Sequence, residues 1–266
     1  MITLAVNGAA GRMGLSIIRL AAVSKDFKLV LAADRADHPQ SGKDVGLMAG
    51  LGKPLGVKLV PLSPGGEAAK RLQRDGALRS QPKPAFGKKA DVAIDFSLPN
   101  GTMACLKSCL KHRIPLVIGT TGFDKSQLNQ IRKASRTIPC FLSPNMSLGA
   151  NLLFKLGAQA ARTLGPDYDA EIIETHHRFK KDAPSGTAKR LSESVSEVSK
   201  KNIPIHSLRI GDVVGDHTVV FSNLGERIEL THRVNNRDIF ARGAIYAAKF
   251  LAAAKPGLYS MADILA

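Results

Sequence analysis

Short apolar runs of the kind that form buried strands recur along the first 145 residues, at 2–6, 27–33, 91–96, 116–118 and 138–142. Amphipathic stretches typical of helices separate them, at 15–23, 103–112 and 126–135. Strands that alternate with helices form βαβ units, whose crossovers make the sheet parallel. The pattern therefore predicts an α/β domain with a doubly wound parallel sheet. Small polar residues follow several of these runs, at the sheet edge where such folds bind ligands.

The pattern changes after residue 151. A long apolar helix is predicted at 152–164 and a second helix at 188–198, with alternating strands at 169–174, 218–222 and 227–231. Such a mixture predicts a C-terminal α+β domain with a mixed sheet. We place the first domain at 1–146 and the second at 147–242. The remaining residues, 243–266, contain a further predicted helix and are expected to pack back on the first domain.

A glycine-rich turn, Gly8-Ala9-Ala10-Gly11-Arg12-Met13-Gly14, joins the first apolar run to the first helical pattern. Glycine lets the backbone turn tightly and approach a pyrophosphate, whose charge the free N–H groups of the next helix would meet. Asp34 ends the second apolar run, about twenty residues further on, where dinucleotide-binding folds place an acid. The first domain is therefore predicted to be a Rossmann-type dinucleotide-binding domain.

The residues that follow the second apolar run give opposite signals about the nucleotide. Asp34 can accept hydrogen bonds from the ribose hydroxyls of NAD, whereas Arg35 can pair with the 2′-phosphate of NADP. We therefore expect the protein to use both NADH and NADPH.

The chain carries 38 Lys and Arg against 22 Asp and Glu, a net charge of +16. A positive field of this size attracts phosphates, dicarboxylates and polyanions. Three cysteines without a Cys-x-x-Cys pair argue against a zinc or redox site, so no metal is expected. No apolar run approaches the ~18 residues of a membrane span, and no secretory signal is visible, so we expect a soluble cytoplasmic protein.

A basic stretch rich in Pro and Gly occupies residues 61–90. We expect an exposed loop there, with a short helix near 67–74. Its basic residues lack the interleaved aromatics of a nucleic-acid stacking surface, so the prediction for them is a solvated face.

The segment from Glu174 to Ala188 concentrates chemistry. It places two histidines and two lysines just before a Pro-Ser-Gly-Thr turn that opens a predicted helix. A carboxylate bound at Gly186 and Thr187 would receive backbone N–H groups, the threonine hydroxyl and the positive end of that helix. His176 and Lys180 can supply protons near neutral pH when their pKa values are tuned. The segment therefore predicts an acid/base site for an anionic substrate.

With these motifs the chain resembles the dihydrodipicolinate reductase family over nearly its whole length. The similarity rests on the glycine-rich turn, the run 176–188, and the segments 94–97, 117–123, 145–151, 211–218 and 225–227. The resemblance implies an oxidoreductase of the diaminopimelate route to lysine, which reduces 4-hydroxy-tetrahydrodipicolinate with NADH or NADPH. It also implies a small dianionic dicarboxylate as substrate and a homotetramer built through the sheet of the second domain.

The resemblance further implies a role for individual residues. His176 would be the general acid/base and Lys180 the proton donor. Substrate carboxylates would be held by His177, Gly186 and Thr187. The cofactor would contact Gly8, Ala9, Ala10, Gly11, Arg12 and Met13 with its pyrophosphate, Asp34 and Arg35 with its adenosine end, and Gly119, Thr120, Thr121, Ser143, Pro144, Asn145 and Met146 with its nicotinamide half. Met146 stands where the family usually has Phe.

Two other classes of protein share part of this pattern. Another dehydrogenase of a small acid or amino acid would keep the glycine-rich turn, but it has no particular need for a doubled His with Lys180 and the Pro-Ser-Gly-Thr turn. A dinucleotide-sensing, nucleic-acid-binding protein would use the positive charge. It would also need grouped aromatic residues, and the 10 Phe and 3 Tyr here are scattered. No nucleic-acid partner is therefore expected.

Overall fold

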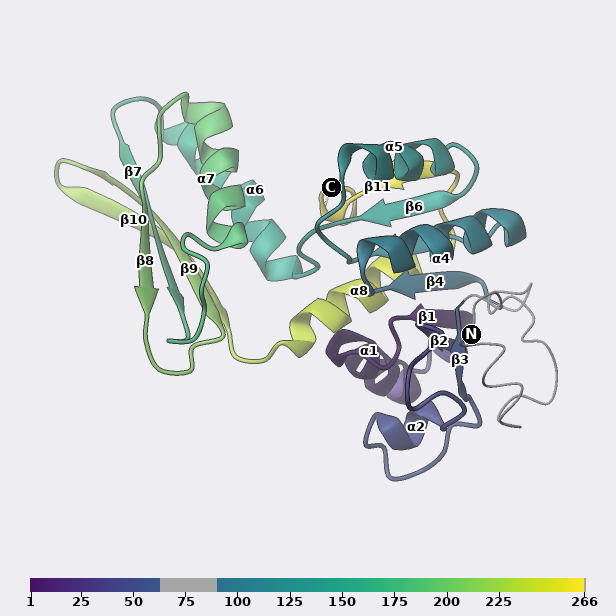
Figure 1. Ribbon diagram of the computed structural model, residues 1–266. Coiled ribbons are helices and arrows are strands. Elements are labelled where there is room, and N and C mark those ends of the chain that lie inside the picture. Colours follow the sequence, from purple (N-terminus) through teal and green to yellow (C-terminus); the bar gives the residue numbers. More distant parts are fainter. Residues whose placement is uncertain (63–89, 266) are drawn as a thin grey trace. The chain divides into compact units, whose positions relative to one another are not determined.

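The computed structural model describes residues 1–62 and 90–265, so the helix expected near 67–74 lies outside the described residues. The chain divides into two compact units, shown together in Figure 1. Unit 1 contains Met1–Met146 and Phe240–Ile264, and unit 2 contains Ser147–Ile239 with Leu265. Unit 2 is thus inserted between two segments of unit 1.

Unit 1 is built on a seven-stranded sheet in the order β11-β6-β5-β4-β1-β2-β3, in which every pairing is parallel. The strands are β1 (Ile2–Asn7), β2 (Phe27–Asp34), β3 (Leu59–Pro61), β4 (Val92–Asp95), β5 (Leu116–Ile118), β6 (Pro139–Leu142) and β11 (Gly257–Tyr259). The helices are α1 (Arg12–Val23), α2 (Val45–Met48), α4 (Pro99–His112), α5 (Lys125–Ala134), α8 (Asp238–Leu251) and α9 (Met261–Ile264). The predicted doubly wound parallel sheet is confirmed.

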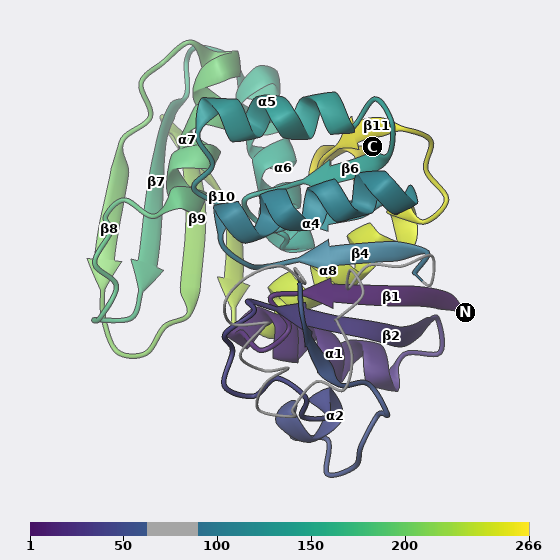
Figure 2. The ribbon, with the colours of Figure 1, turned by 45° about the vertical axis from the view of Figure 1, so that its right-hand side comes forward.

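Helices α4 and α5 lie together on one face of this sheet (Figure 2). Their apolar sides bury Leu106 and Ile131 against strand residues such as Leu116 and Ile118. Burial of this kind stabilises a domain by roughly 25 cal/mol for each Å² of apolar surface removed from water. The packing fixes the strands, and with them the loops at their carboxyl ends.

Strands β1 and β4 are neighbours in the sheet, but the chain runs outward from them in opposite directions, through β2 to β3 and through β5 to β6. The loops that follow β1 and β4 therefore diverge at the carboxyl edge. Open parallel sheets bind their ligands in the crevice formed at such a reversal. The glycine-rich turn leaves β1 at this point.

Unit 2 is a four-stranded mixed sheet in the order β10-β9-β7-β8. Its strands are β7 (Asp169–His176), β8 (Ile205–Arg209), β9 (Gly215–Asn223) and β10 (Glu226–Val234). Strand β8 is parallel to β7, and β9 is antiparallel to both β7 and β10. Helices α6 (Leu148–Leu164) and α7 (Gly186–Ser199) pack on the sheet through residues such as Leu191 and Phe221. The predicted mixed sheet with helices is confirmed.

Three strands have no counterpart in the sequence prediction: β3, β8 and β11. Two of them are only three residues long. The third, β8, lies at the edge of its sheet and reads Ile-His-Ser-Leu-Arg, with no residue fully buried. An edge strand with little buried surface shows little apolar alternation, so the pattern gave no signal for it.

Every helix within residues 1–62 and 90–265 is too short or too polar to cross a lipid bilayer.

Candidate active site

The glycine-rich turn of unit 1 has no room for side chains at two positions. Gly8 has a φ of +70°, and a Cβ there would lie 2.3 Å from the carbonyl oxygen of Phe96. A Cβ at Gly14 would lie 2.2 Å from the carbonyl oxygen of Gly8. The N-cap of α1 is Gly11, which gives its first turn no side-chain hydrogen bond. A bare turn leading into an uncapped helix fits a pyrophosphate, so these residues suit the dinucleotide.

Asp34 ends β2 beside this turn. Its Oδ2 accepts a hydrogen bond from the backbone N–H of Ala10 at 2.9 Å, and its Oδ1 accepts one from the backbone N–H of Arg35 at 2.8 Å. The Arg35 side chain is exposed and lies 3.6 Å from Asp37. The carboxylate thus fixes the glycine-rich turn, in addition to lying where the prediction places the adenosine end of the nucleotide.

The loops after β4, β5 and β6 meet the same carboxyl edge, and a buried carboxylate ties several of them together. Asp95 accepts hydrogen bonds from Asn7 Nδ2 at 2.5 Å, Ser97 Oγ at 2.8 Å, Thr102 Oγ1 at 2.5 Å and Thr120 Oγ1 at 2.8 Å. Burial raises the pKa of Asp95, and the four donors oppose that effect. The predicted cofactor residue Thr120 is therefore held in place by Asp95, to which the sequence analysis assigned no role.

The loop after β6 holds the last predicted cofactor residues. Ser143 Oγ donates to the carbonyl oxygen of Asn145 at 2.8 Å, which closes the turn. The Met146 side chain is buried, and its carbonyl oxygen lies against α8. A Cβ at Gly243 would come within 1.7 Å of that oxygen. Met146 thus anchors this loop to α8 within unit 1.

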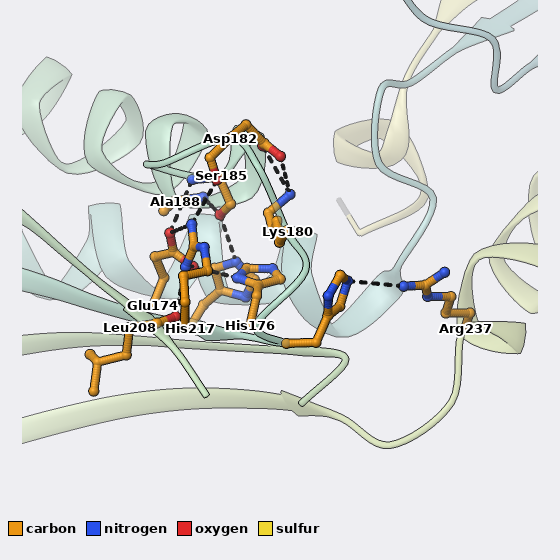
Figure 3. A network of polar contacts seen from close by, with 11 residues as sticks. Glu174, His176, Lys180, Asp182, Ser185, Ala188, Leu208, His217 and Arg237 are labelled. Carbon is orange, nitrogen blue, oxygen red and sulfur yellow. Dashed lines mark hydrogen bonds and ion pairs between the residues drawn. The ribbon is translucent and has the colours of Figure 1, made fainter. Parts of the chain in front are cut away.

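In unit 2 the last residues of β7 carry the acid/base groups (Figure 3). The Glu174 side chain is 0% exposed and His176 is 7% exposed. Because side chains two apart on a strand share a face, both point to the same side of the sheet. Nδ1 of His176 contacts Oε2 of Glu174 in a short hydrogen bond. A buried carboxylate therefore orients the imidazole.

Arg209, at the end of β8, closes the other side of this carboxylate. Its Nη2 donates to Oε1 of Glu174 at 2.7 Å, and its Nη1 donates to Oε2 at 3.0 Å. Burial alone would raise the pKa of Glu174, but the hydrogen bonds from Arg209 and His176 lower it to about 2. Glu174 is consequently ionised at neutral pH.

The imidazole of His176 lies in a mixed electrostatic field. Burial lowers its pKa, the carboxylate of Glu174 raises it, and the positive charges of Lys180 and Arg209 lower it again. The net direction is downward from the ordinary histidine value, so the neutral ring predominates at pH 7. The neutral ring can take a proton and the protonated ring can give one, which is the chemistry of a general acid/base.

A second histidine packs against this ring. The ring centroids of His176 and His217 are 5.1 Å apart, edge to face. Burial, with the nearby His176, lowers the pKa of His217 to about 4, so it is neutral. Its Nε2 lies 3.1 Å from Ser185 Oγ, and that oxygen accepts the N–H of Ala188 as the N-cap of α7. His217 therefore supports the start of α7, where a carboxylate is predicted to bind.

Lys180 and His177 lie in the loop between β7 and α7. Lys180 Nζ donates to both oxygens of Asp182, at 2.8 and 2.9 Å, and this contact lowers the pKa of Asp182. His177 Nε2 lies 3.3 Å from Nη2 of Arg237, a residue that the sequence analysis did not identify. The loop thus brings the positive charge of Lys180 near His176, and Arg237 adds a positive charge beside His177.

Gly186 and Thr187 are the first residues of α7, directly after its N-cap Ser185. No acidic residue occupies the first turn of this helix. The ionised Glu174 reaches the helix start from β7, where its Oε1 accepts the N–H of the N-cap Ser185 at 3.2 Å. The first turn itself carries no acid, and its positive end suits a carboxylate.

One glycine borders the reactive side of the imidazole. A Cβ at Gly215, the first residue of β9, would lie 3.0 Å from Nε2 of His176 and 3.3 Å from its Cδ2. The missing side chain leaves space at Nε2, the nitrogen that Glu174 does not use.

In unit 2, contacts link His176 through Glu174 and His217 to the N-cap of α7, whereas His177 contacts Arg237. In unit 1, Asp95 links the end of β1 to Thr120. Glu174, Asp182 and Ser185 lie inside the motif that the sequence analysis noticed, but their roles are visible only in the structure. Arg209 and Arg237 gave no signal, because they come from distant and weakly patterned segments.

Comparison with known proteins agrees with this architecture. Residues 2–146 match the family described as "Dihydrodipicolinate reductase, N-terminus", and residues 149–265 match "Dihydrodipicolinate reductase, C-terminus". The chain is 41% identical to a 4-hydroxy-tetrahydrodipicolinate reductase of Syntrophus aciditrophicus, with 100% of this chain and 98% of that one covered. It is 42% identical to the enzyme of the same name from Methanocaldococcus jannaschii, with 100% and 97% covered.

A solved structure shares the fold. It is a dipicolinate-bound dihydrodipicolinate reductase from Paenisporosarcina sp. TG-14, with a TM-score of 0.75, 28% identity and 99% of each chain covered. Since matches to both family halves together span almost all of the sequence, the chain belongs to the dihydrodipicolinate reductase family.

Proposed function

We propose that this chain reduces 4-hydroxy-tetrahydrodipicolinate to tetrahydrodipicolinate with a reduced pyridine nucleotide, in the diaminopimelate route to lysine. The observation that carries the proposal is His176, oriented by Glu174 and close to cationic groups and to the start of α7. A proton donor beside a carboxylate site is what the reduction of a dianionic substrate needs.

The substrate residues have distinct tasks in this proposal. Gly186 and Thr187 bind one carboxylate through the backbone and hydroxyl at the start of α7. His177 binds the other, and Arg237 adds positive charge next to it. Hydrogen bonds from charged donors are roughly twice as strong as neutral ones, so the dianion is held firmly.

The reduced nicotinamide, when bound, supplies the hydride that is added at C4 of the substrate. The 4-hydroxyl leaves as water, and this requires one proton. In its protonated form, His176 gives that proton from Nε2, because its Nδ1–H is engaged by Glu174. Lys180 is a second proton donor beside it, held by Asp182.

Unit 1 would hold the nucleotide. Gly8, Gly11 and the start of α1 suit the pyrophosphate, and Thr120 with the loop 143–146 suits the nicotinamide half. Asp34 with Arg35 supports the use of both NADH and NADPH. The exposed Arg35 guanidinium, now 3.6 Å from Asp37, would suit a 2′-phosphate, and the Asp34 carboxylate, which also accepts the N–H of Ala10, would accept ribose hydroxyls. Michaelis constants for the two nucleotides that differ by more than about a hundredfold would contradict dual use.

We also propose a cytoplasmic homotetramer. Its support is the family resemblance, together with Ile173 and Leu208, which are 41% and 45% exposed on the face of the unit 2 sheet that its helices leave open. Light scattering on the purified protein measures the mass of the assembly and decides this point.

A coupled assay tests the activity. Pyruvate and aspartate semialdehyde are passed through the preceding synthase, and the loss of NADH or NADPH absorbance is followed for the wild type and for His176→Gln. We expect oxidation that requires the synthase and falls at least about a hundredfold in the variant, the usual range for removing a general acid or base. Folded protein that oxidises neither nucleotide would refute the proposal and would favour a dehydrogenase of another small acid.

A further inference from the structure

We propose that Glu174 is a positioning residue for the acid/base His176, and that Arg209 balances it, so that the two charges together set how readily Nε2 of the imidazole takes and gives its proton. This inference rests on the proposed function, because it assigns to His176 the proton transfer of that reaction.

The first argument is the direction in which the ring is held. Glu174 is ionised, so its Oε2 accepts a hydrogen bond and Nδ1 of His176 must carry the hydrogen. In the neutral ring the lone pair is then at Nε2, and in the charged ring the exchangeable proton is at Nε2. Gly215 leaves space beside this nitrogen. The carboxylate thus selects one tautomer and presents the reactive atom.

The second argument is that the carboxylate is itself fixed. Arg209 meets both oxygens of Glu174 in a two-point contact, and the backbone N–H of Ser185 donates to Oε1 at 3.2 Å. Arg209 Nη2 also donates to the carbonyl oxygen of Asp182 at 2.7 Å. A fully buried carboxylate with this many donors has one rotamer available, so the orientation of His176 follows from it.

The third argument concerns charge. Four groups face His176: Glu174 from its own strand, Arg209 from β8, Lys180 from the loop after β7, and His217 from β9. His217 is neutral, and the charge of Lys180 is partly offset by Asp182. Glu174 and Arg209 therefore act on the imidazole in opposite directions, the first favouring the proton and the second opposing it.

A purely structural reading of the same contacts is that the buried ion pair only joins β7 to β8. Breaking a buried pair by removing one partner destabilises a protein in either case. Loss of stability therefore does not separate the two readings. Since removing either charge shifts the titration of a nearby imidazole, the deciding measurements are kcat and the ring tautomer. A pair that only joins the strands predicts that neither changes in a folded variant.

The experiment compares Glu174→Gln and Arg209→Met with the wild type, by the pH dependence of kcat and kcat/KM in the coupled assay. In Glu174→Gln we expect kcat to fall at least about tenfold, while KM stays within about threefold of the wild-type value. We also expect the limb of the pH profile that reports the titration of His176 to move to lower pH. In Arg209→Met the same limb moves to higher pH. Shifts of the same sign, or a pH profile unchanged in Glu174→Gln, would overturn the proposal.

The matched control is Glu171→Gln. Glu171 lies on the same strand and also pairs with a histidine, His206 Nε2 at 2.8 Å, but this pair is exposed on the other face of the sheet. If only the buried carboxylate of Glu174 positions His176, Glu171→Gln should keep wild-type kinetics and the wild-type pH profile.

Two further measurements keep the result interpretable. The double variant Glu174→Gln/Arg209→Met removes both buried charges, so it retains the fold if the single variant does not. The double variant stays slow if Glu174 positions His176. It recovers wild-type kcat if only the unpaired charge was harmful, which would refute the positioning role of Glu174.

Nitrogen NMR of the His176 ring reports its tautomer without turnover. If the wild-type protein shows the Nδ1–H tautomer but has no reductase activity, only the proposed function is contradicted. If Glu174→Gln no longer favours the Nδ1–H tautomer, the positioning role is supported.

Discussion

Gly215→Ala tests the reactive side of the imidazole with one added methyl group. The new Cβ would lie 3.0 Å from Nε2 and 3.3 Å from Cδ2 of His176, whereas ordinary contacts begin near 3.4 Å. The ring must therefore move by about 0.4 Å or more. Glu174 holds the ring at Nδ1, so it cannot turn away freely.

The expected loss follows from this displacement. Misplacing a catalytic group by about 1 Å costs on the order of 100-fold in rate, so a shift of about 0.4 Å predicts roughly a 3- to 10-fold fall in kcat. Stability should change little. Gly215 is not among the glycines with positive φ, so its backbone conformation permits alanine. Alanine also reduces the conformational freedom of the unfolded chain, which stabilises the folded protein by about 0.4–1 kcal/mol and offsets the cost of the new contact.

The assay measures kcat, the substrate KM and the thermal midpoint of Gly215→Ala beside those of Gly157→Ala. A Cβ at Gly157 would lie 3.3 Å from Leu191 Cδ1 and 3.4 Å from Val195 Cγ2, in the apolar core of the same unit. The control therefore adds a methyl group in a similar but slightly looser contact, and this group does not touch the imidazole. Wild-type kcat in folded Gly215→Ala would show that Nε2 does not need this space, and the assignment of the proton to that nitrogen would be wrong.

Three further outcomes are expected. Thr187→Val should mainly raise the substrate KM, and an unchanged KM would mean that the carboxylate binds elsewhere. His217 titrates near pH 4 when folded and near pH 6.5 when unfolded, so the unfolded chain binds the extra proton between these values and the free energy of unfolding should fall by about 3 kcal/mol as pH drops from 6.5 to 4. His217→Gln should lose this part of the slope in denaturant titrations at several pH values. Asp95→Asn should weaken NADH binding about tenfold by fluorescence titration, since an amide offers the four donors one acceptor oxygen instead of two. Asp91→Asn, just before the opposite end of β4, should bind normally.

Local patterns were sufficient to predict the parts of the fold that are specified by neighbouring residues. The glycine-rich turn precedes α1 directly, and Ser185 caps the helix whose start was predicted to bind a carboxylate. In both cases a short motif carries its own physical reason, because the atoms that interact are within a few residues of each other.

The remaining parts of the site depend on tertiary pairing. Asp95 receives Asn7 from 88 residues earlier, and Glu174 meets Arg209 from 35 residues later. A single sequence carries no record of such contacts. The sequence pattern also gave no signal for Arg209 because it lies on β8, a mostly polar edge strand that forms by pairing with β7.

The pairing of β11 with β6 has a consequence for the order in which the protein takes shape on the ribosome. Unit 2 is one continuous segment apart from Leu265, so it can acquire its contacts as soon as residues 147–239 have emerged. Unit 1 contains the earlier residues, yet its sheet lacks a strand until Gly257–Tyr259 are synthesised. At about 5–20 residues per second, translation leaves the edge of β6 uncovered for several seconds or longer. During that interval the nascent chain presents an open parallel strand edge, the kind of surface that chaperones protect.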